Sequence, residues 1–211
     1  MLNGCGWRPH ANKVAESPSS RQRPVSVFRP EFIEALSLLA QACDDLAAKG
    51  YERPVLVGGA AVEFHTGSAV VSGDFDFVTE EQRAFEAALI AHGFRREDRV
   101  GRLLRGLYHP ELDLGVEVVS GALFDGRSDL RRVQLVEIAN GKSVAIAPVE
   151  DLIADRMGQY VSTDNRIPEM LDQAVKLFQL ADDVDEAYLA LRIRDETNGV
   201  VDLPYLKEMA K

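Results

Sequence analysis

Residues 56–80 read "LVGGAAVEFHTGSAVVSGDFDFVTE", and the interpretation of the whole chain starts from this stretch. The glycine pair Gly58-Gly59 follows a short apolar run, and Asp74 and Asp76 stand one residue apart at the head of the next apolar run. Short apolar runs bounded by turn residues are typical of buried strands. The order predicts a strand, a glycine turn, a short helix and a return strand, which brings the glycines and the aspartates to the same end of a sheet.

The composition is that of a soluble globular chain. Its 211 residues are 46% apolar and 27% charged, with a net charge of −10, which argues against a general electrostatic grip on nucleic acid. No apolar run is long enough to span a membrane. Two cysteines far apart, Cys5 and Cys43, indicate neither a disulfide framework nor a zinc site, so we expect a reduced, cytoplasmic setting.

Three regions follow one another along the chain. Residues 1–28 are rich in Pro, Ser and Arg and lack an apolar signal segment, so we expect a flexible tail. Residues 29–147 mix helical and strand-like patterns, whereas residues 148–211 carry only helical ones. The expected fold class is therefore α+β: a mixed-sheet core with flanking helices and a helical C-terminal portion.

Periodicity and turn residues predict the individual elements. A first helix has one apolar face, made by Phe32, Leu36, Leu39, Cys43 and Leu46. A second follows the first strand over residues 60–67, and the others are expected at 80–92, 148–162, 166–181, 183–196 and 203–210. Later strand-like runs cover 102–109, 114–121, 131–138 and 142–147, with turn sequences such as 123–129 between them.

One stretch, "RREDRVGRLLR", is strongly basic. Five arginines crowd it: Arg95, Arg96, Arg99, Arg102 and Arg105. A local nucleic-acid contact is one interpretation. We favour a solvated hairpin edge protected by charge, because charged side chains commonly guard exposed strands against unwanted pairing.

The aspartate pair and the glycine pair suggest a shared chemistry. Residues two apart in a strand point the same way, so Asp74 and Asp76 present two carboxylates on one face. Such neighbours repel unless a cation lies between them, and magnesium usually takes one or two carboxylates together with substrate phosphates. Residues without a Cβ, such as Gly58 and Gly59, let backbone approach a phosphate at the start of a helix.

In this order the residues resemble the signature of the DNA polymerase β-like nucleotidyltransferase superfamily, and the match covers residues 55–119. The resemblance implies that Gly58 and Gly59 hold a nucleoside triphosphate. It also implies that Asp74 and Asp76 bind two Mg²⁺ ions and that a third acid on a later strand completes the metal site. The ions would stabilise the attacking and leaving oxygens of an in-line displacement at the α-phosphate.

The third acid should project from a strand to the same face as the aspartates. Glu117 in "LGVEVVS" has valines on both sides, and an inward-facing acid is costly unless it meets a cation. The rival is Asp113, in the turn-like "HPELDLG". We favour Glu117, which would also serve as the base that takes the proton of the acceptor hydroxyl.

The helical end resembles, more loosely, the small AbiEii-type nucleotidyltransferases, whose toxin members act in bacterial toxin–antitoxin systems. By position, Arg156 would contact the triphosphate, and Arg166 with Asp172 would line the base or acceptor side. A salt-bridged helix surface is the other interpretation of these three residues. The chain also departs from the superfamily: Gly59 replaces a common serine, so a hydroxyl is missing, and Arg156 replaces a common lysine.

The expected function is metal-dependent transfer of a nucleoside monophosphate from an NTP such as ATP to an acceptor: an RNA end, a protein hydroxyl or a small molecule. One alternative is a haloacid-dehalogenase-like phosphatase with Asp74 as nucleophile. It would need a later acidic pair, for which Asp182-Asp183 is the only candidate, and it has no use for the glycines. A catalytically inactive nucleotide-binding or antitoxin module is the other alternative.

Overall fold

A computed structural model describes residues 27–96, 106–112, 114–162 and 166–211. The α-helices within these ranges are α1 (Pro30–Ala48), α2 (Gly58–His65), α3 (Gln82–Ala91), α4 (Val149–Val161), α5 (Pro168–Leu180), α6 (Glu186–Thr197) and α7 (Leu203–Met209). The strands are β1 (Val55–Val57), β2 (Asp74–Val78), β3 (Arg95–Arg96), β4 (Leu107–His109), β5 (Leu114–Ser120), β6 (Gln134–Ala139) and β7 (Lys142–Ile146). Two short 3₁₀ turns, η2 (Leu123–Gly126) and η3 (Leu130–Arg132), follow β5.

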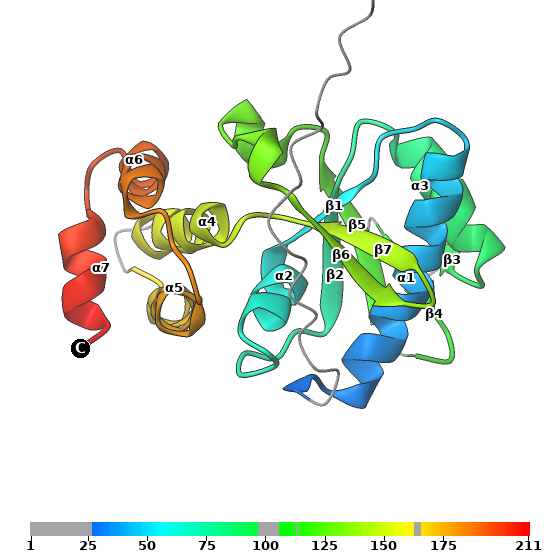
Figure 1. The fold of residues 1–211 in the computed structure, drawn as a ribbon, viewed down its shortest axis with the longest axis horizontal. Coiled ribbons are helices and arrows are strands. Elements are labelled where there is room, and N and C mark those ends of the chain that lie inside the picture. Colours follow the sequence, from blue (N-terminus) through cyan, green and yellow to red (C-terminus); the bar gives the residue numbers. More distant parts are fainter. Residues whose placement is uncertain (1–26, 97–105, 113, 163–165) are drawn as a thin grey trace, which may run out of the picture.

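The strands form one mixed sheet in the order β3-β4-β5-β2-β1-β7-β6. At its centre β2 runs parallel to β5 and antiparallel to β1, and β1 runs parallel to β7. Helices α1 and α3 lie on one side of this sheet, and α2 lies between the sheet and the C-terminal helices (Figure 1). The α+β fold expected from the sequence is therefore confirmed.

The alternation of β2 decides which of its faces belongs to the core. Phe75 and Phe77 are buried, and their rings pack against α1 and α3: Phe75 lies 5.5 Å from Phe32, and Phe77 lies 5.0 Å from Phe85, between ring centroids. Because successive side chains of a strand point to opposite faces, Asp74 and Asp76 project away from this aromatic layer.

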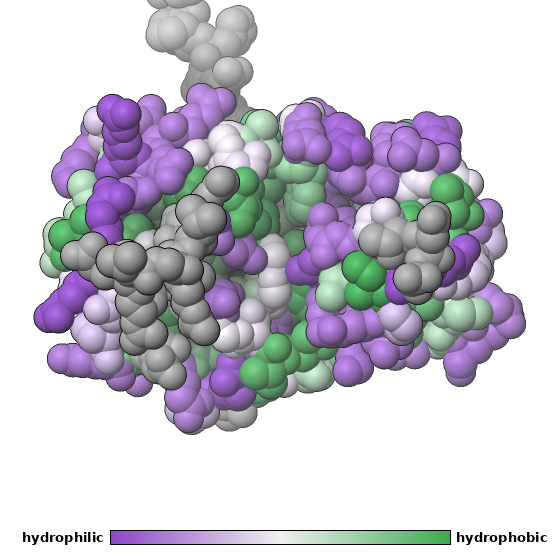
Figure 2. Space-filling view, turned by 180° about the vertical axis from the view of Figure 1, so that it is seen from behind, coloured by the Kyte–Doolittle hydropathy of each residue, from purple (hydrophilic) through white to green (hydrophobic). Residues whose placement is uncertain are grey.

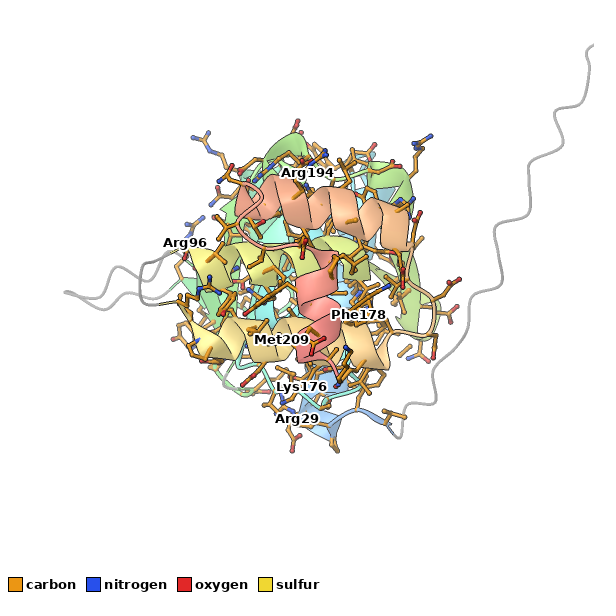
Figure 3. All side chains as sticks on the ribbon, turned by 90° about the vertical axis from the view of Figure 1, so that its left-hand side faces the viewer. Arg29, Arg96, Lys176, Phe178, Arg194 and Met209 are labelled. Atoms are coloured by element: carbon orange, nitrogen blue, oxygen red, sulfur yellow. The ribbon has the colours of Figure 1, made fainter. Side chains whose placement is uncertain are left out.

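The C-terminal helices pack as a group, in which α4 lies between α5 and α6 and α7 crosses over them (Figure 3). A fully buried ion pair joins α4 to α6, since Arg192 Nε donates to Asp151 Oδ1 at 2.5 Å. The Asp151 carboxylate also accepts hydrogen bonds from Ser128, after η2, and from Tyr188 on α6. These bonds fix the helices to the segment that follows β5.

The outer parts of the molecule are polar. Polar residues cover most of the face seen from behind, with apolar residues in separate patches (Figure 2). Within the described ranges, none of the helices combines the length and the apolar character needed to cross a membrane.

Several predicted elements can now be compared with the structure. The apolar face of α1 is buried as expected, and four helices follow residue 148. Arg95 and Arg96 form the exposed edge strand β3, as the hairpin interpretation predicted, whereas Arg99, Arg102 and Arg105 lie outside the described residues. One local prediction was wrong, because the second helix begins at Gly58 rather than at residue 60. The turn expected at 123–129 is confirmed, and it contains the 3₁₀ turn η2.

Only the end of the expected tail can be described. Residues 1–26 lie outside the described residues. Phe28 is buried, and its ring stacks on Phe64 of α2 at 5.4 Å between centroids. The next residue, Arg29, precedes α1, and it lies low in Figure 3, below α5.

The buried ion pair of α4 and α6 yields a stability prediction. Replacing Arg192 with Met leaves Asp151 buried without its cation, which should lower the free energy of unfolding by about 3 kcal/mol. The control is Arg194→Met on the same helix, where the side chain is largely exposed and the change should stay within about 0.5 kcal/mol. Urea denaturation measures both, and equal losses would contradict the assignment.

Candidate functional site

Two neighbouring strands, β2 and β5, position the three predicted carboxylates. In their parallel register, Asp76 stands opposite Glu117, and Asp74 stands opposite Gly115. All three acids alternate with core residues along their strands, so they share the face that looks away from α1 and α3. Asp76 and Glu117 are half-buried, whereas Asp74 is exposed. The structure thus brings Glu117 beside the aspartates, while Asp113 lies outside the described residues.

Glycines make room for the carboxylates. Gly58 has a φ of +63°, which favours glycine, and a Cβ built on it would overlap the carboxylate of Asp76. Gly115 serves Asp74 in a similar way, since a Cβ there would lie 2.7 Å from Asp74 Oδ1. Gly58 is also the first residue of α2, where backbone N–H groups have no partner within the helix. The carboxylate of Asp76 and the N–H groups that have no partner within α2 therefore lie together at the start of this helix.

The surroundings of Asp76 disfavour its negative charge. Burial raises the pKa of this carboxyl above its ordinary value, and the charges of Glu117 and Asp74 raise it further. Arg156 works in the opposite direction, whereas Asp155 adds to the increase. A site that raises the pKa of a carboxylate in this way gains free energy when a cation enters it.

Arg156 reaches this site from the middle of α4. Its side chain is 7% exposed, and its Nε is buried without a hydrogen-bond partner. The Nη1 donates over 3.3 Å to Asp155 and lies 4.0 Å from the sulfur of Met170. A buried guanidinium with an unused donor, close enough to Asp76 to lower its pKa, is suited to an anionic ligand.

The other two residues predicted for the nucleotide site, Arg166 and Asp172, belong to α5 and the residues just before it. Arg166 stacks over the ring of Tyr160 and donates to its hydroxyl at 2.8 Å. The Tyr160 hydroxyl also bonds that of Tyr205 on α7, and this contact, together with Arg166, lowers the pKa of Tyr160. Asp172 is exposed on α5. Among the described residues, no hydrogen bond or ion pair connects Arg166 or Asp172 with the three carboxylates.

Three residues near the carboxylates were not predicted. Ser72, two residues before Asp74, places its hydroxyl against Gly59. Glu63 on α2 is fully buried and holds the backbone of Ser72. Asp155 precedes Arg156, and burial raises its pKa. In the sequence, only its nearness to the two aspartates in "SGDFDF" points to Ser72. Nothing in the sequence around Glu63 or Asp155 indicates a place near the site.

The carboxylates suit a hard cation, which binds oxygen ligands. Within the part of the chain that the structure describes, no three His, Cys, Asp or Glu side chains are grouped closely enough to hold an ion unaided. The donor set therefore fits magnesium when other ligands, such as phosphate oxygens, complete its shell.

Comparisons with known proteins place the fold. An antigenic nucleotidyltransferase-like protein from Paracoccidioides brasiliensis matches with a TM-score of 0.55 at 16% identity, over 85% of this chain and 92% of that one. The antibiotic-resistance factor ANT(2'')-Ia matches with a TM-score of 0.49 at 13% identity, over 79% of this chain and 89% of that one. No family model and no curated protein matches the sequence. The first likeness shows that this chain has a nucleotidyltransferase-like fold.

The close approach of Gly58 to Asp76 can be tested by substitution. Gly58→Ala should destabilise the protein through two effects, the positive φ and the overlap with Asp76. Gly50→Ala is the matched control, because Gly50 has a φ of +85° but an added Cβ there meets nothing within 4 Å. The control should lose about 1–2 kcal/mol in urea denaturation, and Gly58→Ala should lose clearly more. Equal losses would show that Asp76 does not lie against Gly58.

The raised pKa of Asp76 predicts a pH dependence. In the folded protein the carboxyl holds its proton to a higher pH than in the unfolded chain, so its contribution to stability falls as pH rises through this window. Asp76→Asn should therefore be more stable than the wild type at pH 7 in EDTA. The gain should disappear in acid, where Asp76 is protonated in both states. A variant that is less stable than the wild type at pH 7 would contradict the pKa shift.

Proposed function

We propose that this protein is a metal-dependent nucleotidyltransferase that moves a nucleoside monophosphate from an NTP to an acceptor. The observation that carries the proposal is that groups suited to cations and groups suited to an anion lie close together. Asp74, Asp76 and Glu117 concentrate negative charge, while the start of α2 and Arg156 offer donors to an anion. A triphosphate bound with divalent cations satisfies both sets of groups.

The two expected Mg²⁺ ions would lie at the carboxylates of Asp74, Asp76 and Glu117. These are hard oxygen ligands on adjacent strands, and magnesium commonly shares its shell between one or two carboxylates and substrate phosphates. When bound, the ions would supply stabilisation of the charge that develops on the attacking and leaving oxygens.

The chain's own groups have distinct tasks in this proposal. Backbone N–H groups of Gly58 and Gly59 bind phosphate oxygens at the start of α2. Arg156 adds a planar guanidinium, whose buried Nε is free to donate. Glu117 lies beside Asp76 and takes the proton of the acceptor hydroxyl as that oxygen attacks the α-phosphate. The bond from the α-phosphorus to the bridging oxygen breaks, and pyrophosphate leaves.

The acceptor is an RNA end, a protein hydroxyl or a small molecule, and ATP is one candidate donor. A place in a bacterial toxin–antitoxin system, in the cytoplasm, rests on the AbiEii-like helical end. Arg166 and Asp172 would then act at the acceptor side, outside the carboxylate cluster. The position of Arg166 on Tyr160 gives an equally direct account of that residue as a structural contact.

The phosphatase alternative receives no comparable support. Asp182 and Asp183, its only later acidic pair, lie in the exposed connection between α5 and α6. Moreover, the close fit of Gly58 against Asp76 has no role in that chemistry.

The proposal predicts magnesium-dependent binding of a nucleoside triphosphate. In a buffer with roughly 5 mM Mg²⁺, a non-reactive α,β-methylene analogue of each NTP should bind the wild type in calorimetry and raise its melting temperature. Asp76→Asn should lose at least about tenfold in affinity, because it loses a charged ligand. Glu208→Gln changes an exposed side chain of α7, far along the chain from the carboxylates, and as the control it should bind normally.

Turnover separates the enzyme from an inactive binding module. Each α-labelled NTP is incubated with the protein, Mg²⁺ and a cell extract, and the labelled species is identified. Binding without any labelled acceptor would favour the inactive module. Binding and labelling that persist in Asp76→Asn would overturn the proposed site.

A further inference from the structure

The hydroxyl of Ser72 lies over the first turn of α2. A Cβ built on Gly59 would come 2.6 Å from Ser72 Oγ and 3.2 Å from Ser72 Cβ, so a side chain at position 59 would collide with this serine. Gly59 does not have the positive φ of Gly58, and space is therefore the reason for a glycine here. The hydroxyl of Ser72, which comes from the loop before β2, therefore occupies the space beside position 59.

Buried contacts hold Ser72 in this position through its backbone. Its N–H donates to Glu63 Oε2 at 2.6 Å, and its carbonyl accepts from Arg29 Nη2 at 3.0 Å. Glu63 is fully buried, and Arg29 Nε and Ser68 Oγ donate to its other oxygen at 2.8 and 2.9 Å. These bonds tie the loop before β2 to α2 and to the residue that precedes α1.

The side chain of Ser72 is left for another task. Its hydroxyl donates to the carbonyl of Asp74 at 3.0 Å, which is a local bond that rotation about χ1 can exchange. On the same side lie the free N–H groups at the start of α2 and the site of Asp76. A second, independent sign of an anion is the unpartnered Nε of Arg156, which is more than nine-tenths buried and near Asp76.

We propose that Ser72 is a phosphate-contacting residue of the nucleotide site, which supplies a hydroxyl from the loop before β2 to the start of α2. The inference rests on the proposed function and assigns one contact within it. Glu63 and Arg29 are then positioning residues, which act through the backbone of Ser72. Gly59 has the complementary role of leaving the hydroxyl room beside the helix start.

The test measures binding of inorganic triphosphate and of the tightest α,β-methylene NTP by calorimetry in Mg²⁺. Ser72→Ala keeps both backbone contacts, so it should fold normally, yet it should weaken both probes about tenfold, the loss typical of one hydrogen bond to a charged group. Inorganic triphosphate has no base or sugar. A loss for this probe therefore locates the contact on the phosphates.

Ser120→Ala is the matched control. It removes a hydroxyl that, like that of Ser72, makes an exposed local bond to the backbone two residues on, but that lies outside the network of Glu63 and Arg29, and it should leave the affinity within about twofold. Equal weakening by Ser120→Ala and Ser72→Ala would show that the loss is not specific to Ser72 and would overturn a direct contact by this residue.

A double variant that moves the hydroxyl from position 72 to position 59 provides a further test. Gly59→Ser alone should weaken binding because it collides with Ser72, whereas Gly59→Ser combined with Ser72→Gly should recover affinity relative to Ser72→Gly. Absence of this recovery would overturn the shared position of the two hydroxyls. If the wild type binds and Ser72→Ala binds equally well, this inference alone fails. If the wild type binds neither probe, the proposed function fails with it.

Discussion

The pairing of β2 with β5 is the constraint on which the site depends. It sets Asp76 opposite Glu117, and burial together with repulsion from Glu117 raises the pKa of Asp76 in the folded protein. The hydrogen bonds of the ladder and the burial of Phe75 and Phe77 on the other face offset this cost. Because alternate residues of β2 serve the core and the site, a register shift of one residue would exchange them.

The C-terminal helices supply a positively charged side chain near the three carboxylates. On α4, Asp151 and Arg156 are five residues apart, which at about 100° per residue turns them to well-separated faces of the helix. Asp151 binds Arg192 of α6, and Arg156 lies near the carboxylate of Asp76. One helix thus connects the packing of the C-terminal group with the electrostatics of the site.

On the other side of the site, a buried carboxylate organises the loop before β2. Glu63 is tolerated in the interior because Arg29, Ser68 and the backbone of Ser72 satisfy its oxygens. Arg29 comes from the segment just before α1, and its neighbour Phe28 packs on Phe64 of α2. The residues just before α1 therefore help to hold the loop that lies against the glycine pair.

The sequence by itself determined the elements whose signals are local. The three- and four-residue spacing of Phe32, Leu36 and Leu39 predicted α1, and the alternation in "DFDF" predicted a strand with two acids on one face, because helix and strand periodicities act over a few residues. The resemblance of the glycine and aspartate pairs to a known signature predicted the fold. The start of α2 was misplaced because a glycine pair reads locally as a turn, whereas packing against β2 continues the helix through it.

Only the tertiary structure decided which distant residues meet. Glu117 becomes a neighbour of Asp76 through strand pairing across forty residues, and Arg156 approaches through the packing of α4. Arg166, which sequence position assigned to the base or acceptor side, donates to the hydroxyl of Tyr160 in the structure. Ser72 could not be identified from the sequence, because its hydroxyl matters only where it lies against Gly59, thirteen residues earlier. Long-range contacts of this kind follow from how whole elements pack, and no window of sequence contains the information that selects them.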